Sequence, residues 1–255
     1  MSTSAPAKLL ESLTAHGPRA AFPSTRWTLI ERLRNHEAVD KDDRALAELC
    51  RLYWPPIYAF LRRKGYRPMD AQDLTQGFFA MVIAKNMFGS ADPGKGRLRT
   101  FLLSALRNFV ADHHRKEGAV KRGGGERVMS MDAEDAEGLL NQIPSAGLTP
   151  EGVFEQAWAL RLLDMVLERT RARYERIHKG AEFQALAPYL SGDDPSPPYR
   201  ELAARMNLDE ASVRLLMHRM RRRYRLILEE SIAESAGSRA DAEDELGHLF
   251  RVLGR

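Results

Sequence analysis

The feature that most constrains the fold is the spacing of apolar residues between Tyr199 and Leu228. They recur at intervals of three or four, which places them on one face of a helix: Val213, Leu216, Met220, Tyr224 and Ile227. Asp209 precedes this run and can accept hydrogen bonds from the free N–H groups of a helix start. The spacing therefore predicts a long helix that begins after Asp209.

A shorter apolar stripe precedes that helix: Tyr199, Leu202, Ala203 and Met206. Leu208 lies in the connecting turn, at the position where such helix pairs bury one residue. The segment therefore predicts a short helix, a turn and a long helix.

The long helix is strongly basic. Between Glu210 and Leu228 there are six arginines and one acid, Glu210, for a local charge of 6 − 1 = +5: Arg214, Arg219, Arg221, Arg222, Arg223 and Arg225. Such a helix can bury one face and turn the other toward phosphates and base edges. A solvated surface is the alternative for any run of charges, but the preceding short helix favours nucleic-acid binding.

No segment shows the alternation of apolar and polar residues that is typical of a strand. We expect an all-α fold of two helical modules, over residues 27–117 and 153–236. Residues 118–152 are rich in Gly and small residues and predict a flexible linker. A disordered N-terminal tail (1–26) and a C-terminal tail (237–255) complete the chain.

The first module contains two helical stretches before its basic part. Residues 44–64 carry an apolar stripe that Pro55 and Pro56 are expected to kink or break. Residues 70–85 leave a polar face that contains Asp70, Asp73 and Gln76. Phosphates would repel these acids, so this face suits a protein partner better than DNA.

A second basic stretch follows in the same module. Residues 97–122 hold seven basic residues and two acids, for a charge of 7 − 2 = +5. Phe101 and Phe109 belong to its apolar stripe. Two separate modules therefore each present a basic helix, which indicates a protein that touches nucleic acid at two places.

Composition excludes several classes of protein. Cys50 is the single cysteine, so an internal disulfide is excluded and a buried thiol is expected. There is no apolar run long enough for a membrane span and no secretory signal, so we expect a cytoplasmic protein without a membrane partner. The formal net charge is only +4, so the basic character is local.

Catalysis and metal binding are not expected either. Adjacent His113 and His114 point about 100° apart on a helix and lack a third ligand nearby. No Gly-rich loop follows a strand, and no cofactor is expected. A DNA recombinase would need a nucleophile domain, usually with a sheet, whereas the first 150 residues look helical.

These residues resemble the bacterial sigma-70-type RNA polymerase sigma factors of the small extracytoplasmic-function (ECF) kind. Residues 65–83 are similar to region 2.2, whose D-L-x-Q core is present here as Asp73, Leu74 and Gln76. Residues 96–116 are similar to regions 2.3 and 2.4, which include an Arg-Asn pair, here Arg107-Asn108. Residues 199–225 are similar to region 4.2, with its paired positions occupied by Val213-Arg214 and His218-Arg219.

The resemblance implies a sigma factor that binds core RNA polymerase, at the β′ clamp helices and the β flap, and promoter DNA. It also admits an anti-sigma factor as a partner. The implied polymerase contacts are Asp70, Asp73 and Gln76. The implied contacts with the −10 element are Arg99, Arg107, Asn108, His113 and Arg115. Those with the −35 element are Ser212, Arg214, His218, Arg219 and Arg222.

For several residues two interpretations stay open. Arg214 suits a bidentate bond to guanine or a phosphate contact, and His218 a phosphate contact or plain solvent exposure. Phe101 and Phe109 suit strand melting or the core. Gly77 stands where the family often has an acid, and residues 192–198 lengthen the approach to the helix pair. A stand-alone helix-turn-helix regulator is the alternative function.

Overall fold

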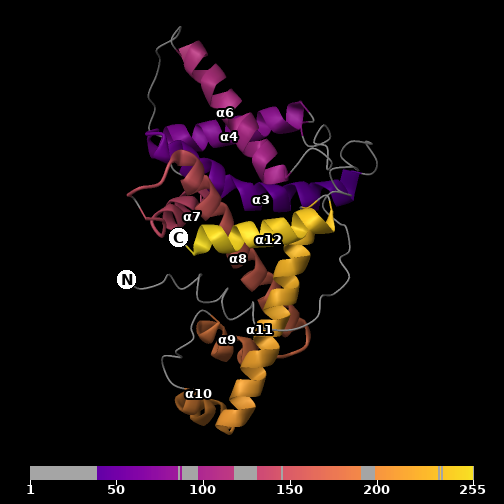
Figure 1. Ribbon diagram of the computed structural model, residues 1–255. Helices are drawn as coiled ribbons and strands as arrows, with labels where there is room; N and C mark the ends of the chain where they lie inside the picture. Colours follow the sequence, from indigo (N-terminus) through magenta and orange to yellow (C-terminus); the bar gives the residue numbers. More distant parts are fainter. Residues whose placement is uncertain are drawn as a thin grey trace. The chain divides into compact units, whose positions relative to one another are not determined.

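The computed structural model describes residues 39–85, 87, 97–117, 131–144, 146–190, 199–234, 236 and 238–254. Within these residues the secondary structure is helical and contains no strand, which confirms the all-α prediction (Figure 1). The predicted tail over 1–26 and the insertion at 192–198 lie outside them. The chain divides into two compact units, which are treated separately.

The first unit comprises the described residues of 24–161 and 233–242. Its central helix, α3 (Val39–Arg63), packs against α4 and α7. The predicted break at Pro55 and Pro56 is wrong, because α3 continues through both. Pro55 has no N–H to offer the Arg51 carbonyl, and Arg161 Nε donates to that oxygen instead at 3.2 Å.

Two further helices of this unit are α4 (Pro68–Ala84) and α6 (Leu98–Glu117). α4 begins with proline at its first position, where a missing N–H costs nothing. It buries Leu74, Phe78 and Val82 on the side opposite its polar face. The ring of Phe78 meets that of Phe109 edge to face, with centroids 5.7 Å apart, so Phe109 holds α6 against α4.

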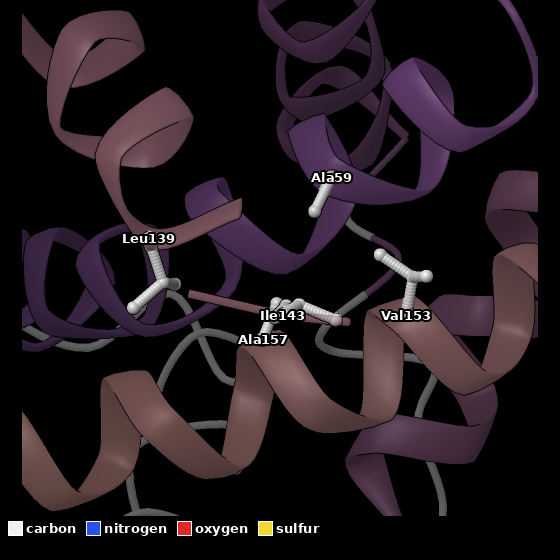
Figure 2. Close-up of a cluster of buried hydrophobic side chains, with 5 residues drawn as sticks. All are labelled: Ala59, Leu139, Ile143, Val153 and Ala157. Atoms are coloured by element: carbon white, nitrogen blue, oxygen red, sulfur yellow. The ribbon is translucent and has the colours of Figure 1, made fainter. Parts of the chain in front are cut away.

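The predicted linker 118–152 needs correction in its second part; residues 118–130 lie outside the described residues. Residues 131–152 contain α7 (Met131–Leu140) and the start of α8 (Pro150–Arg176). Figure 2 shows how side chains from these segments gather around Ala59 of α3 in one buried apolar cluster: Leu139, Ile143, Val153 and Ala157. Tertiary burial stabilises α7, a helix too short to be stable alone.

Polar contacts fix the same segment to α3. Glu137 on α7 accepts from Tyr58 Oη at 2.6 Å and from Arg62 Nε and Nη2 at 3.0 and 2.9 Å. The hydrogen bond from Arg62 lowers the pKa of Glu137, so its charged form is the stable one. Arg63 donates twice to the Leu148 carbonyl, at 3.0 and 2.8 Å. Residues 131–157 thus belong to the first unit.

One further residue of α3 has a distinctive environment. Cys50 is a free thiol and is half-buried. Desolvation raises its pKa to about 11. The predicted buried thiol is therefore only partly buried, but it is held in the protonated form at neutral pH.

The second unit comprises the described residues of 162–232 and 243–255. After the second half of α8 come α9 (Gly180–Leu186) and a 3-10 turn, η2 (Ala187–Tyr189). Next are α10 (Tyr199–Met206) and α11 (Glu210–Ala233), which are the predicted short and long helices. Tyr224 of α11 donates to the Leu163 carbonyl of α8 at 3.1 Å and so ties these two helices together.

The turn between α10 and α11 differs in one respect from the prediction. Asn207 adopts a left-handed conformation with φ of +53°, and the Leu208 N–H bonds the Ala203 carbonyl at 2.9 Å. This cap directs the Leu208 side chain outward, where it is 41% exposed. The prediction that the turn buries Leu208 is therefore wrong.

The C-terminal tail is also more ordered than predicted. α12 (Arg239–Leu253) covers most of residues 237–255, which were predicted only as a tail. Ser238 caps it, since its Oγ accepts from the Asp241 N–H at 3.1 Å. Leu249, Val252 and Leu253 are buried. No helix in the described part of the chain is long and apolar enough to cross a bilayer.

Candidate nucleic-acid interface

The outward face of α4 is a narrow stripe of exposed residues at helical spacing: Asp73, Gln76, Ala80, Ile83 and Ala84. Two of the three residues predicted to contact polymerase lie on it. The third, Asp70, is half-exposed and accepts from Arg67 Nε at 2.8 Å, so its charge is partly neutralised at the start of the helix. The stripe combines one acid, one amide and one exposed isoleucine.

The outward face of α6 is polar and partly cationic. Its exposed residues recur along one side of the helix and include one acid: Thr100, Ser104, Arg107, Asn108, Ala111, Asp112, His114 and Arg115. The opposite side is buried through Leu102, Leu106 and Val110. Arg107, Asn108 and Arg115, three of the five predicted −10 contacts, therefore share one surface.

Arg99 is not on that surface. It is 3% exposed, forms an ion pair with Glu155 of α8, and its guanidinium lies 4.9 Å from the ring centroid of Trp158. A buried cation of this kind needs its acid partner to offset desolvation. The prediction that Arg99 contacts DNA is corrected: it joins α6 to α8.

Arg107 is exposed but paired. Its Nε and Nη2 lie 3.1 and 3.0 Å from Glu151 Oε1, in the first turn of α8. Desolvation acts to raise the pKa of Glu151, but a backbone hydrogen bond and Arg107 outweigh it and lower that pKa. Thr149 fixes this turn, because its Oγ1 accepts from the Gly152 N–H at 3.1 Å.

The remaining residues of α6 differ in availability. Arg115 pairs with Asp112 on its own helix. His113 is half-buried with its ring centroid 6.5 Å from that of Phe109, so it faces the helix packing more than solvent. His114, which was not predicted as a contact, shares a 2.8 Å hydrogen bond with Tyr66 Oη. Phe109 serves the core, and Phe101 is half-buried.

The outward face of α11 is the second cationic surface. Its exposed residues are Ala211, Arg214, Leu215, His218, Arg219 and Arg222, followed near its end by one acid, Glu230. The predicted apolar face is buried on the other side through Val213, Met220 and Tyr224. Four of the five predicted −35 contacts therefore line one face of α11.

Local contacts position the start of α11. Asp209 accepts from the Ser212 N–H and Oγ, both at 2.7 Å, and these bonds keep the pKa of Asp209 below its usual range. The hydroxyl of Ser212, the fifth predicted −35 contact, is thus engaged in the hydrogen bond that caps the helix. Arg214 pairs with Glu210 at 2.5 Å and lies 5.4 Å from the Tyr199 ring centroid, which holds its guanidinium near the helix start.

Three other arginines of α11 are engaged within the second unit. Arg221 donates to the Tyr189 carbonyl at 3.3 Å, and Arg225 pairs with Glu229 at 2.8 Å. The guanidinium of Arg223 lies 5.0 Å from the Tyr174 ring centroid. The six arginines of this helix therefore do not form one uniform cationic surface.

Sequence reasoning missed the acids that face α6, Glu151 and Glu155. A signal for the helix that carries them was present: Thr149-Pro150-Glu151 combines a capping residue, a first-turn proline and a first-turn acid. That pattern predicts a helix start at the end of the presumed linker. Among the described residues, no group of three His, Cys, Asp or Glu could hold a metal ion.

Comparison with known protein families gives a match to part of the chain. Residues 49–120 match the sequence model of the family Sigma-70 region 2, a range that contains most of α3 and all of α4 and α6. Searches of curated proteins and of solved structures find no match. The helices that carry the α4 stripe and the cationic face of α6 therefore lie in the segment that is similar to sigma-70 region 2.

Proposed function

We propose that this protein is an ECF-type sigma factor, which binds core RNA polymerase and directs initiation at promoters by recognising −10 and −35 elements. The observation that carries the proposal is the coincidence of the region 2 match with two separate exposed faces. One is the acidic and amide stripe of α4, and the other is the polar and cationic face of α6.

The stripe of α4 is the proposed polymerase-binding surface, facing the β′ clamp helices. Its acid would repel phosphates and its amide would not attract them. Ile83, which is 48% exposed, adds apolar area at the end of the stripe. The second unit would contact the β flap, as the family resemblance implies. An anti-sigma factor as a partner stays a prediction. The proposed activity is transcription initiation, so the proposed location of the protein is the cytoplasm.

The two cationic faces are the proposed promoter contacts. Asn108 and Arg107 of α6 would meet the −10 element, and α11 would enter the major groove at the −35 element. Arg214 is the best candidate to read a base, because a positioned guanidinium can bond guanine at two atoms. Arg219 and Arg222 would contact phosphates and supply affinity.

Run-off transcription with purified core polymerase and genomic promoter fragments tests the proposal. Asp73→Arg should abolish both transcription and co-purification with polymerase. Glu134→Arg, a charge reversal at an exposed acid of α7, is the matched control and should keep both. Equal polymerase binding by Asp73→Arg and the parent protein would refute the assignment of the α4 stripe.

The role of α6 is tested separately with Asn108→Ala. This change should spare −35 binding and reduce promoter opening, measured by permanganate reactivity of unpaired thymines with polymerase present. If the variant and its parent open the promoter equally, Asn108 has no part in −10 recognition. If neither opens any promoter, the stand-alone regulator becomes the better interpretation, since it needs only α11.

A further inference from the structure

The charges of residues 131–160 are of one sign. This segment contains six acids and no Lys, Arg or His: Asp132, Glu134, Asp135, Glu137, Glu151 and Glu155. It packs within the first unit, where α6 is basic. Three of its acids pair with arginines of α3 and α6, namely Arg62, Arg99 and Arg107.

The backbone that carries Glu151 is held firmly in place. Val153 and Ala157 of α8 lie in the apolar cluster with Ala59 of α3 (Figure 2). The preceding Leu148 carbonyl accepts two hydrogen bonds from Arg63, at 3.0 and 2.8 Å. Glu151 therefore stands beside Arg107 because its helix is docked, and the ion pair need not supply the docking energy.

The contact itself resembles a phosphate contact in its chemistry. Arg107 Nε donates to Glu151 Oε1 and Nη2 lies 3.0 Å from the same oxygen, and these are the N–H groups that a guanidinium also offers to phosphate oxygens. The Arg107 side chain is 54% exposed, so the pair is weak and a second anion can reach it. The Arg99–Glu155 pair, by contrast, is buried and is not available for exchange.

We propose that Glu151 occupies Arg107 in place of a nucleic-acid phosphate, so that the docked acidic segment weakens nucleic-acid binding by the outward face of α6. This inference rests on the proposed function, which makes that face a nucleic-acid contact. Nucleic acid has to displace the Glu151 carboxylate from Arg107 while α8 stays docked. The segment thus acts as a built-in competitor.

Fluorescence anisotropy of the full chain with a labelled oligothymidylate at low ionic strength tests this directly. Glu151→Gln keeps the side-chain shape and removes the charge, and should bind about two- to five-fold more tightly, the value of one exposed ion pair. Glu151→Asp keeps the charge but shortens its reach, and should also bind more tightly. Glu134→Gln removes a charge from the same segment without touching Arg107, and should bind like the parent.

The double variant with Arg107→Ala separates the outcomes. In that background Glu151→Gln should have no effect, because there is no guanidinium left to release. If Glu151→Gln matches the parent while Arg107→Ala binds more weakly, the competitor is refuted and α6 remains a nucleic-acid contact. If Arg107→Ala itself binds like the parent, two claims are refuted: that Glu151 competes for Arg107, and that Arg107 contacts nucleic acid. If Glu134→Gln increased the affinity for the oligonucleotide as much as Glu151→Gln, the effect would come from the net charge of the segment and the proposal of a specific Glu151–Arg107 contact would be refuted.

Discussion

The two basic helices, α6 and α11, belong to segments of equal formal charge in the sequence, +5 over 97–122 and over 210–228. Their cations are engaged very differently. Arg99 and Arg107 of α6 meet acids 56 and 44 residues away, Glu155 and Glu151. Arg214 and Arg225 of α11 meet acids four residues away on the same helix, Glu210 and Glu229.

This difference shows why a count of charges says little about a binding surface. On α11 the acids that pair with Arg214 and Arg225 are visible from i,i+4 spacing, and Arg219 and Arg222 stay on the exposed face. On α6 the acids that meet Arg99 and Arg107 are brought there by the tertiary packing of a segment that has no basic residue, whereas Arg115 pairs with Asp112 on its own helix. Among the side chains that the structure describes, α6 therefore has fewer exposed arginines than α11, namely Arg107 and Arg115 against Arg214, Arg219 and Arg222.

The largest expected effect comes from the buried cation of α6. Arg99→Ala leaves the Glu155 carboxylate, 18% exposed, without its partner, and should lower the free energy of unfolding by about 3 kcal/mol. Urea denaturation followed by tryptophan fluorescence measures it, since Trp158 adjoins the site. Arg219→Ala on the exposed face of α11 should change stability by less than about 0.5 kcal/mol. If both substitutions lowered the free energy of unfolding equally, the proposed difference between the arginines of α6 and those of α11 would be wrong.

A second effect concerns base reading by α11. Arg214→Ala should relax preference at one or two −35 positions, a loss of about 1–3 kcal/mol if the contact is bidentate. Binding to a set of single-base −35 variants measures this. Arg225→Ala, whose guanidinium pairs with Glu229, is the matched control and should keep the preference of the parent. A uniform loss for Arg214→Ala would make it a phosphate contact.

A smaller and sequence-independent effect is expected at Arg222. Arg222→Ala should weaken all duplexes alike and reduce the slope of log affinity against log salt by about 0.9, the value for one phosphate. A salt titration of duplex binding measures the slope. Arg223→Ala is the control, because that guanidinium packs on Tyr174 and should leave the slope unchanged. A loss at only some sequences would place Arg222 at a base.

The smallest expected effect concerns the packing of α6 against α4. A Cβ at Gly77 of α4 would lie 3.5 Å from Phe109 Cζ, an ordinary contact. Gly77→Ala should therefore raise the free energy of unfolding by about 0.5–1 kcal/mol, through the reduced flexibility of the unfolded chain. Gly138→Ala on α7, where a Cβ meets nothing within 4 Å, is the control for the backbone term alone. A loss of stability only at Gly77 would show that α4 and α6 pack too closely for a methyl group.

Much of the fold was predictable because it rests on local patterns. The apolar spacing of Val213, Met220 and Tyr224 gave the buried face of α11, and Asp209 gave its start. The exposure of Asp73 and Gln76 followed from the periodicity of α4 in the same way. These features need only a helix of 3.6 residues per turn.

The features that were not predictable depend on distant partners. As α3 continues through Pro55, the Arg51 carbonyl that loses its helical donor accepts from Arg161, 110 residues away. Arg99 is buried because Glu155 lies opposite, and α7 is a helix because Leu139 finds an apolar cluster. Periodicity within one segment carries no information on such pairs.

The environment of Cys50 has a practical consequence for labelling chemistry. With a pKa of about 11, the thiol is ionised in only about one molecule in ten thousand at pH 7, so it reacts slowly with maleimides and other electrophiles. Cysteines introduced at exposed positions such as Glu134 and Arg222 would react much faster than this native thiol. The chain is thus suited to site-specific dye pairs, one on each compact unit, without removal of its own cysteine.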